Sequence, residues 1–111
     1  MTLPEINLED FQNIDLRVGE IVQAEKIEGT KALLALRVNL GEEERNLVAG
    51  LANYYWPEEL VGKKIIVLTN LKPATIRGIK SEGMLLAADD GKGTVSILTV
   101  DRDIAPGSKI R

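Results

Sequence analysis

Five cations stand close together in the second half of the chain and are the side chains best suited to bind an anionic partner. They lie within residues 62–80, a stretch without a single acidic residue, and they are Lys63, Lys64, Lys72, Arg77 and Lys80. A guanidinium binds phosphate through its planar fork, and an ammonium binds it as a point charge. The run therefore offers phosphate-binding chemistry, although a solvated charged loop has the same composition.

The charge of the whole chain is unevenly distributed, which strengthens this interpretation. The formal net charge is -3 and the pI is about 5.0. Residues 1–61 contain five basic and twelve acidic residues, a net charge of -7, whereas residues 62–111 contain nine basic and five acidic residues, a net charge of +4. Such asymmetry gives an acidic protein one face that attracts anions.

Catalytic side chains are scarce in this sequence. It has no cysteine and no histidine, which excludes disulfides, thiolate nucleophiles, imidazole bases and zinc sites with cysteine or histidine ligands. The carboxylates of Asp89, Asp90, Asp101 and Asp103 are the candidates for binding a hard cation, but acids beside glycines are typical of turns. We therefore expect no catalytic residue, no metal and no cofactor.

Length and composition favour one globular domain over residues 1–111. Hydrophobic residues make up 44% of the chain and charged residues 28%, which is ordinary for a globular protein. No apolar run approaches the roughly 20 residues of a membrane span, and the first fifteen residues contain acids rather than a basic signal start. We expect a cytoplasmic protein with no membrane partner.

Short alternating segments predict an all-β fold. Strands are predicted over residues 16–27, 32–40, 45–51, 63–69, 84–88 and 94–98, a loop over 70–83, and a turn over 89–93. Pro57 at a first helical position, followed by two glutamates, predicts one short helix over 57–61. Several strands with one helix between the third and fourth are typical of a five-stranded OB-fold barrel.

Several details of this barrel are expected from single residues. Gly19 inside the first strand predicts a bend or bulge. The segment before it predicts one helical turn, with Asp10 as its N-cap and with Phe11 and Ile14 facing inward. We interpret the aromatic cluster at residues 54–56 as packing under the helix rather than as a stacking surface.

Ordered sequence blocks point to a family. The blocks are DF at 10–11, DLRVG at 15–19, PEELVGK at 57–63, NLKP at 70–73, RG at 77–78, SEGMLLA at 81–87 and PGSKI at 106–110. Their order over almost the whole chain resembles the tRNA-binding domain family. That module occurs at the C-terminal end of methionyl-tRNA synthetases, as their β subunit, and as free-standing homodimeric proteins.

The resemblance implies structure-specific, largely sequence-independent tRNA binding without catalysis. The residues it assigns to tRNA are Asn70, Lys72, Arg77, Ser81 and Met84, and Lys63, Lys64 and Lys80 would supply the surrounding positive field. Each polar or apolar member also has a structural interpretation. Asn70 suits a turn, Ser81 a loop cap, and Met84 core packing.

The same resemblance implies a homodimer, formed through residues 2–14 and 95–111, and a methionyl-tRNA synthetase catalytic subunit as a partner. An export-type chaperone, or a protein-interaction module on the same fold, is the alternative function. The chain departs from the family before its second strand, where Lys31 stands one place earlier than the usual lysine. Because such a shift moves a strand side chain to the other face, contact of Lys31 with tRNA is left open.

Overall fold

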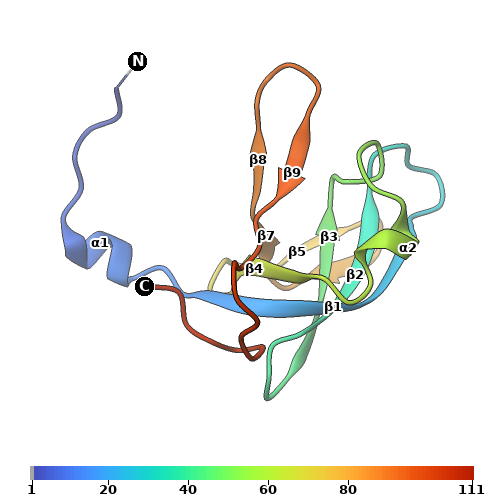
Figure 1. The fold of residues 1–111 in the computed structure, drawn as a ribbon. Helices are drawn as coiled ribbons and strands as arrows, with labels where there is room; N and C mark the ends of the chain where they lie inside the picture. Colours follow the sequence, from blue (N-terminus) through green and yellow to red (C-terminus); the bar gives the residue numbers. More distant parts are fainter. Residues whose placement is uncertain (1) are drawn as a thin grey trace.

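The computed structural model describes residues 2–111 as a nearly closed barrel with a five-stranded antiparallel sheet in the order β3-β2-β1-β4-β7 (Figure 1). The sheet strands are β1 (Leu16–Lys26), β2 (Leu34–Asn39), β3 (Glu44–Ala49), β4 (Lys64–Leu68) and β7 (Met84–Leu85). The remaining elements are helices α1 (Leu8–Gln12) and α2 (Pro57–Leu60), hairpin strands β5 (Ala74–Ile76) and β6 (Ile79–Ser81), and hairpin strands β8 (Ala87–Asp89) and β9 (Val95–Ile97). The predicted five-stranded barrel, with a short helix between its third and fourth strands, is confirmed.

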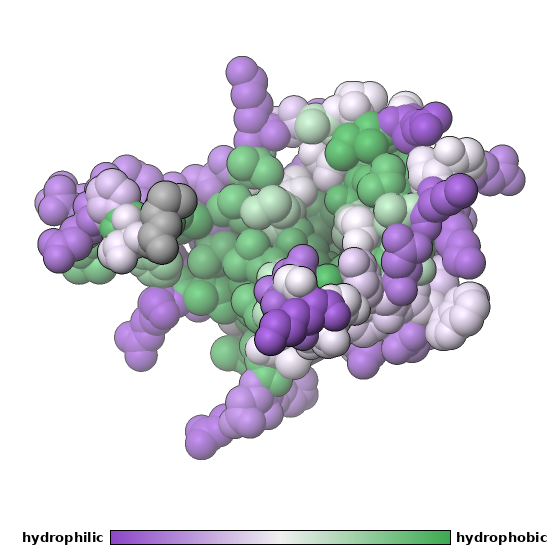
Figure 2. Space-filling model, turned by 90° about the horizontal axis from the view of Figure 1, so that it is seen from above, coloured by the Kyte–Doolittle hydropathy of each residue, from purple (hydrophilic) through white to green (hydrophobic). Residues whose placement is uncertain are grey.

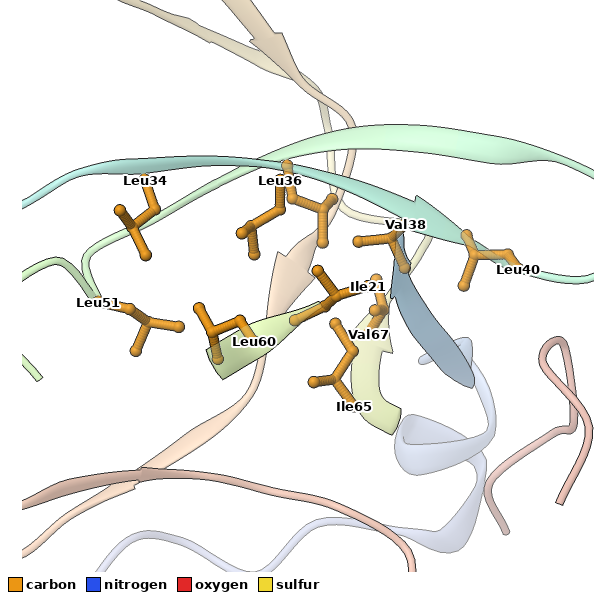
Figure 3. Close-up of a cluster of buried hydrophobic side chains, with 10 residues drawn as sticks. Ile21, Leu34, Leu36, Val38, Leu40, Leu51, Leu60, Ile65 and Val67 are labelled. Carbon is orange, nitrogen blue, oxygen red and sulfur yellow. The ribbon is translucent and has the colours of Figure 1, made fainter. Parts of the chain in front are cut away.

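Alternation along β2 places every second side chain in the core. Leu34, Leu36 and Val38 are buried, and the residues between them are partly exposed. Figure 3 shows these side chains facing Ile21 of β1 and, from α2, Leu60. Each fully buried aliphatic side chain of this kind stabilises the fold by about 1.5–3 kcal/mol.

Gly19 has a different role from the predicted one. A Cβ atom on Gly19 would lie 2.6 Å from Cγ1 of Val38. Only glycine therefore leaves room for the Val38 side chain against the backbone of β1. The irregularity in the β1–β2 register falls between Ile21 and Gln23 instead. The prediction of a bulge in this strand is confirmed, but its position at Gly19 is wrong.

Hydrogen bonds from side chains and from single backbone groups close the barrel between β3 and the β6–β7 segment. The backbone N–H of Val48 donates to Oγ of Ser81 at 3.1 Å, and the backbone N–H of Glu82 donates to the carbonyl of Asn46 at 2.9 Å. Nη1 of Arg45 donates to the carbonyls of Thr69 and Glu82 at 2.7 and 3.2 Å. These bonds take the place of a regular ladder, so closure depends on residues far apart in the sequence.

The predicted loop over residues 70–83 contains the β5–β6 hairpin. Its two-residue turn is Arg77-Gly78, with φ of 52° and 78°, and positive φ at both central positions is typical of a type I′ turn. The first central position of such a turn is usually asparagine, aspartate or glycine. Because arginine occupies it here, the sequence did not indicate the turn. The predicted strand over 84–88 is also divided, because β7 ends at Leu85 and β8 begins at Ala87.

The β8–β9 hairpin extends from the barrel (Figure 1), and its tip contains the predicted acidic turn. The carboxylate of Asp89 accepts the backbone N–H of Gly91, and that of Asp90 accepts the N–H groups of Lys92 and Thr94. Both aspartates are therefore turn residues, as predicted.

The N-terminal helix α1 lies beside the barrel rather than on its core (Figure 1). Asp10 is not the N-cap; Asn7 is, and its backbone N–H donates to the Asp10 carboxylate at 3.0 Å. Phe11 and Ile14 are 37% and 41% exposed, so the expectation that they face inward is wrong for the single chain. In the described part of the chain, neither helix has the length or the apolar composition to cross a membrane.

Candidate nucleic-acid interface

The β5–β6 hairpin presents three of the predicted cations to solvent. Lys72 precedes it, Arg77 occupies its tip and Lys80 lies on β6, and all three are exposed. Arg77 is the one non-glycine residue with a positive φ among residues 2–111. Its Nη2 donates to the carbonyl of Gly29 at 3.4 Å, so the hairpin tip touches the loop between β1 and β2. In an OB fold, these two connections flank the ligand-binding face.

The three hairpin cations have no acidic partner among the described residues, whereas four other cations do. Within residues 2–111, the ion pairs join Arg17 to Asp15, Arg37 to Glu44, Arg45 to Glu43 and Lys64 to Asp103. Lys72, Arg77 and Lys80 form none of them. Their charge is therefore available to an external anion, which is the condition for strong phosphate contact.

Lys63 and Lys64 lie away from the hairpin cations. Lys64 begins β4 and Lys72 follows the other end of that strand. Nζ of Lys64 bonds to Oδ1 of Asp103 at 3.1 Å and to the carbonyl of Ile104, and its side chain is only 17% exposed. The structure therefore separates the eight predicted residues into two areas, and a carboxylate offsets part of the charge in the second.

The side chain of Asn70 fastens the N-terminal segment to the end of β4. Its Nδ2 donates to the carbonyl of Asn13 at 2.7 Å, and its Oδ1 accepts the backbone N–H of Asp15 at 2.9 Å. Both the nitrogen and the oxygen of the Asn70 side-chain amide therefore form hydrogen bonds within the chain. We assign Asn70 to positioning the strand end from which Lys72 follows.

Ser81 is buried at 6% exposure. Its hydroxyl accepts the N–H of Val48 and donates to the carbonyl of Gly83 at 3.3 Å. These two bonds orient the β6–β7 segment, in agreement with the structural alternative for this residue. Ser81 therefore holds the hairpin against β3, and the hairpin presents the cations.

Met84 is 45% exposed, so it is not a core residue. It lines a shallow depression together with Gly50, Tyr54 and Leu86, between β3 and the β8–β9 hairpin. Thioether side chains adapt to flat apolar partners. The geometry therefore allows the contact with a base that the resemblance implies.

Two of the three aromatic residues that we expected to pack under helix α2 are exposed. Tyr55 does pack on the core, and its hydroxyl accepts the N–H of Ile97 at 3.1 Å. Tyr54 and Trp56 on either side are 43% and 68% exposed. The interpretation of the cluster is thus right for Tyr55 and wrong for its neighbours. No sequence pattern indicated this exposure, because residues 52–54 form a turn and not a strand with alternating faces.

The carboxylate of Asp15 gives a pH-dependent contribution to stability. The hydrogen bond from the Thr69 hydroxyl is the main cause that lowers the pKa of Asp15 below its ordinary value of 3.8; desolvation opposes it and the Arg17 charge adds to it. A folded-state pKa below the unfolded value means that this contribution is complete above that value and is lost as the pH falls through the lowered pKa.

Replacing Thr69 with valine should raise the pKa of Asp15 towards 3.8 and move acid unfolding to higher pH, because the carboxylate loses its main donor. The measurement is an NMR titration of the Asp15 carboxyl carbon in both proteins, followed by acid unfolding. Superimposable titration curves would contradict the assignment.

Comparisons with known proteins point to one family. A family model described as a putative tRNA binding domain matches residues 16–109. A methionine–tRNA ligase from Methanocaldococcus jannaschii is 56% identical over 109 residues, which cover 98% of this chain and 17% of that ligase. The chain thus spans about one sixth of the length of the first curated relatives that it matches.

Solved structures match over the full barrel. The crystal structure of a MetRS related protein from Pyrococcus horikoshii has a TM-score of 0.93 at 38% identity, covering 98% of this chain and 100% of that one. The crystal structure of the chaperone CsaA from Bacillus anthracis has a TM-score of 0.88 at 30% identity, covering 97% and 100%.

Proposed function

Because the chain belongs to the putative tRNA binding domain family, we propose that its β5–β6 hairpin is the element that holds tRNA. The observation that carries this proposal is that three exposed cations, without an ion pair among residues 2–111, are gathered at one short hairpin, beside the ligand-binding face of an OB fold. Arg17, Arg37 and Arg45 are engaged by carboxylates, whereas the three hairpin cations Lys72, Arg77 and Lys80 are exposed and form no ion pair among the described residues. We call these three residues the hairpin cations.

The contacts of the hairpin cations are with phosphates rather than with base edges. Phosphate contacts fix the orientation of a nucleic acid but carry no sequence information. Folded RNA is recognised largely through its shape, its phosphates and its 2′-hydroxyl groups. Binding is therefore specific for the structure of tRNA and largely independent of its sequence.

The domain acts in protein synthesis in the cytoplasm, without catalysis of its own. It serves either as a part of, or a subunit bound to, a methionyl-tRNA synthetase, or as a free-standing protein acting in trans. The support for the synthetase is the likeness to methionine–tRNA ligases, of which the chain spans only a small part. Tethering a tRNA-binding module to a catalytic body raises the effective concentration of tRNA there.

The chain works as a homodimer through its two terminal segments, residues 2–14 and 95–111. The last residues of the second segment lie beside the start of β1, because the N–H of Ile110 donates to the carbonyl of Leu16 shortly after α1. They expose Phe11, Ile14, Leu98 and Ile104 by 37–45%. Figure 2 shows a hydrophobic area beside the N-terminal segment, and apolar patches of this kind are typical of interfaces.

Replacing Phe11 and Ile14 together with aspartate should convert the dimer to a monomer, because charges would enter the apolar interface. The fold should persist, since both side chains are exposed in the single chain. Sedimentation at micromolar concentration is the measurement. Val61→Asp is the control, because Val61 is 50% exposed but lies outside both terminal segments. A wild-type chain that sediments as a monomer would contradict the dimer.

The experiment that tests the function is competition for labelled tRNA at low salt. Total unlabelled tRNA should displace the label, whereas duplex DNA of equal phosphate concentration and unfolded polypeptide should displace little. Displacement by unfolded polypeptide ahead of tRNA would contradict the proposal and favour the chaperone alternative.

A further inference from the structure

Two depressions on the surface meet at one aromatic side chain. The first contains Met84 and Gly50, and a Cβ on Gly50 would have nothing within 4 Å. The second contains Lys26 and Trp56. Tyr54 lines both of them. The exposed side chains of Met84, Tyr54 and Trp56 therefore follow one another along a continuous surface, which we call the stacking track.

The far end of the stacking track pairs an exposed ring with a cation. Trp56 is 68% exposed, and Nζ of Lys26 lies 5.1 Å from the centroid of its ring. Surfaces that bind single-stranded nucleic acid combine an aromatic ring, on which a base stacks, with a nearby positive charge for the backbone. A base that stacks on Trp56 takes the place of the ammonium, which then becomes available to a phosphate.

The stacking track is continuous with the hairpin cations through the loop between β1 and β2. At one side of this loop, the carbonyl of Gly29 accepts a hydrogen bond from Arg77. At its other side, the carbonyl of Ala32 accepts the N–H of Ala52, which lines the second depression beside Trp56. An RNA held by Arg77 thus has a path to Trp56 along the same face.

We propose that unpaired nucleotides of the bound RNA stack along the track formed by Met84, Tyr54 and Trp56, next to the duplex regions that the hairpin cations hold. This inference rests on the proposed tRNA binding and extends it to single-stranded RNA. A tRNA carries both kinds of surface, paired stems and unpaired loops and ends. The protein thereby binds two structural features of one molecule.

The chemistry of the second depression favours a base over a phosphate on the ring. Its lining includes the carboxylate of Glu59, which accepts the backbone N–H of Trp56 at 2.8 Å. A carboxylate repels a phosphate but not the neutral face of a base. Lys26, at the same ring, supplies the positive charge that attracts the phosphate of the stacked nucleotide.

The test uses the fluorescence of Trp56, the one tryptophan in the sequence. The probes are total tRNA, an adenine-only RNA of about 12 nucleotides and an RNA duplex of the same length. The tRNA and the single strand should quench the emission of Trp56 and protect it from acrylamide, because a stacked base covers the ring. The duplex should bind through the cations and leave the emission unchanged.

Variants test the energetic contribution of the track. Trp56→Ala and Tyr54→Ala should each weaken binding of the single strand about 5- to 150-fold, the range found for single stacking positions. Both should leave duplex binding unchanged, and Trp56→Phe should retain most of the affinity. Val61→Ala, at a side chain that is 50% exposed but lines neither depression, is the control and should change nothing.

Two results separate this inference from the proposed function. If tRNA binds the wild type with unchanged Trp56 emission, and Trp56→Ala and Tyr54→Ala bind the single strand like the wild type, the stacking track is refuted and tRNA binding stands. If the wild type binds no tRNA at low salt, both fail.

Discussion

Replacing Lys72 and Arg77 together with alanine should weaken tRNA binding about 60-fold near 0.1 M salt. For each phosphate contact that is lost, about one counterion fewer is released on binding. The affinity for tRNA then falls by a factor of about eight at that salt concentration. The slope of log affinity against log salt should also become shallower by about two. Both residues are exposed, so the loss reflects the interface and not the fold. The measurement is tRNA binding over a salt series.

A matched control carries the same change in charge elsewhere. Lys92→Ala with Arg102→Ala also removes one lysine and one arginine, both exposed and away from the β5–β6 hairpin, and should lower affinity much less. Equal losses in the two double variants would mean that net charge, and not the hairpin, governs binding.

The variant Arg77→Gly distinguishes the effect of the Arg77 backbone conformation on stability from the effect of its guanidinium on tRNA binding. Arg77 has a φ of 52°, a conformation that glycine adopts without the steric cost a larger residue bears. The glycine variant should therefore be at least as stable as the wild type while binding tRNA about eightfold more weakly. A variant that keeps full affinity would show that the guanidinium makes no contact.

Ser81→Ala should lower the free energy of unfolding by about 1–3 kcal/mol, because a buried backbone donor loses its partner. The Ser81 hydroxyl bonds to both Val48 and Gly83, so its removal weakens the closure of the barrel between β3 and β6. Denaturant unfolding measures this loss. tRNA affinity of the folded protein should stay within about threefold, because a serine at 6% exposure offers tRNA little surface.

Ser96→Ala is the control for that variant. Ser96 is exposed, and its hydroxyl makes one long bond, at 3.4 Å, to the carbonyl of Ile97. Its replacement should change the unfolding free energy by no more than about 0.5 kcal/mol. If Ser81→Ala left stability intact and abolished tRNA binding, Ser81 would be a contact residue, as the family resemblance implied.

The barrel was predictable because its signals are local. Alternation in β2 follows from the period of a strand, and Pro57 with its two glutamates marks the start of α2. Closure of the barrel was not predictable from local patterns. The Arg45 side chain reaches carbonyls 24 and 37 residues away along the chain, and no short-range pattern encodes such a contact.

The residues of the candidate site also fall into two groups, those that the sequence nominates and those whose role only the fold shows. Residue type and the absence of acids nominated Lys72, Arg77 and Lys80, but nominated Lys64 equally, and only the fold shows that Lys64 is paired with Asp103. Asn70 and Ser81 are polar residues whose hydrogen bonds lie within the chain, which only the fold reveals. Trp56 was misassigned because large aromatic residues are mostly buried, and its 68% exposure depends on how the chain enters α2.

The most direct test of the central claim is to map tRNA onto the chain by NMR, using isotopically labelled protein and unlabelled tRNA. Amide signals of residues 72–84, and of residues 28–31 in the loop that Arg77 contacts, should shift or broaden first. Signals on the acidic first half should change little outside that loop and outside the stacking track with its neighbour Lys26. Perturbations confined to the acidic residues of β1 and β3, with the hairpin unaffected, would contradict the assignment of the interface.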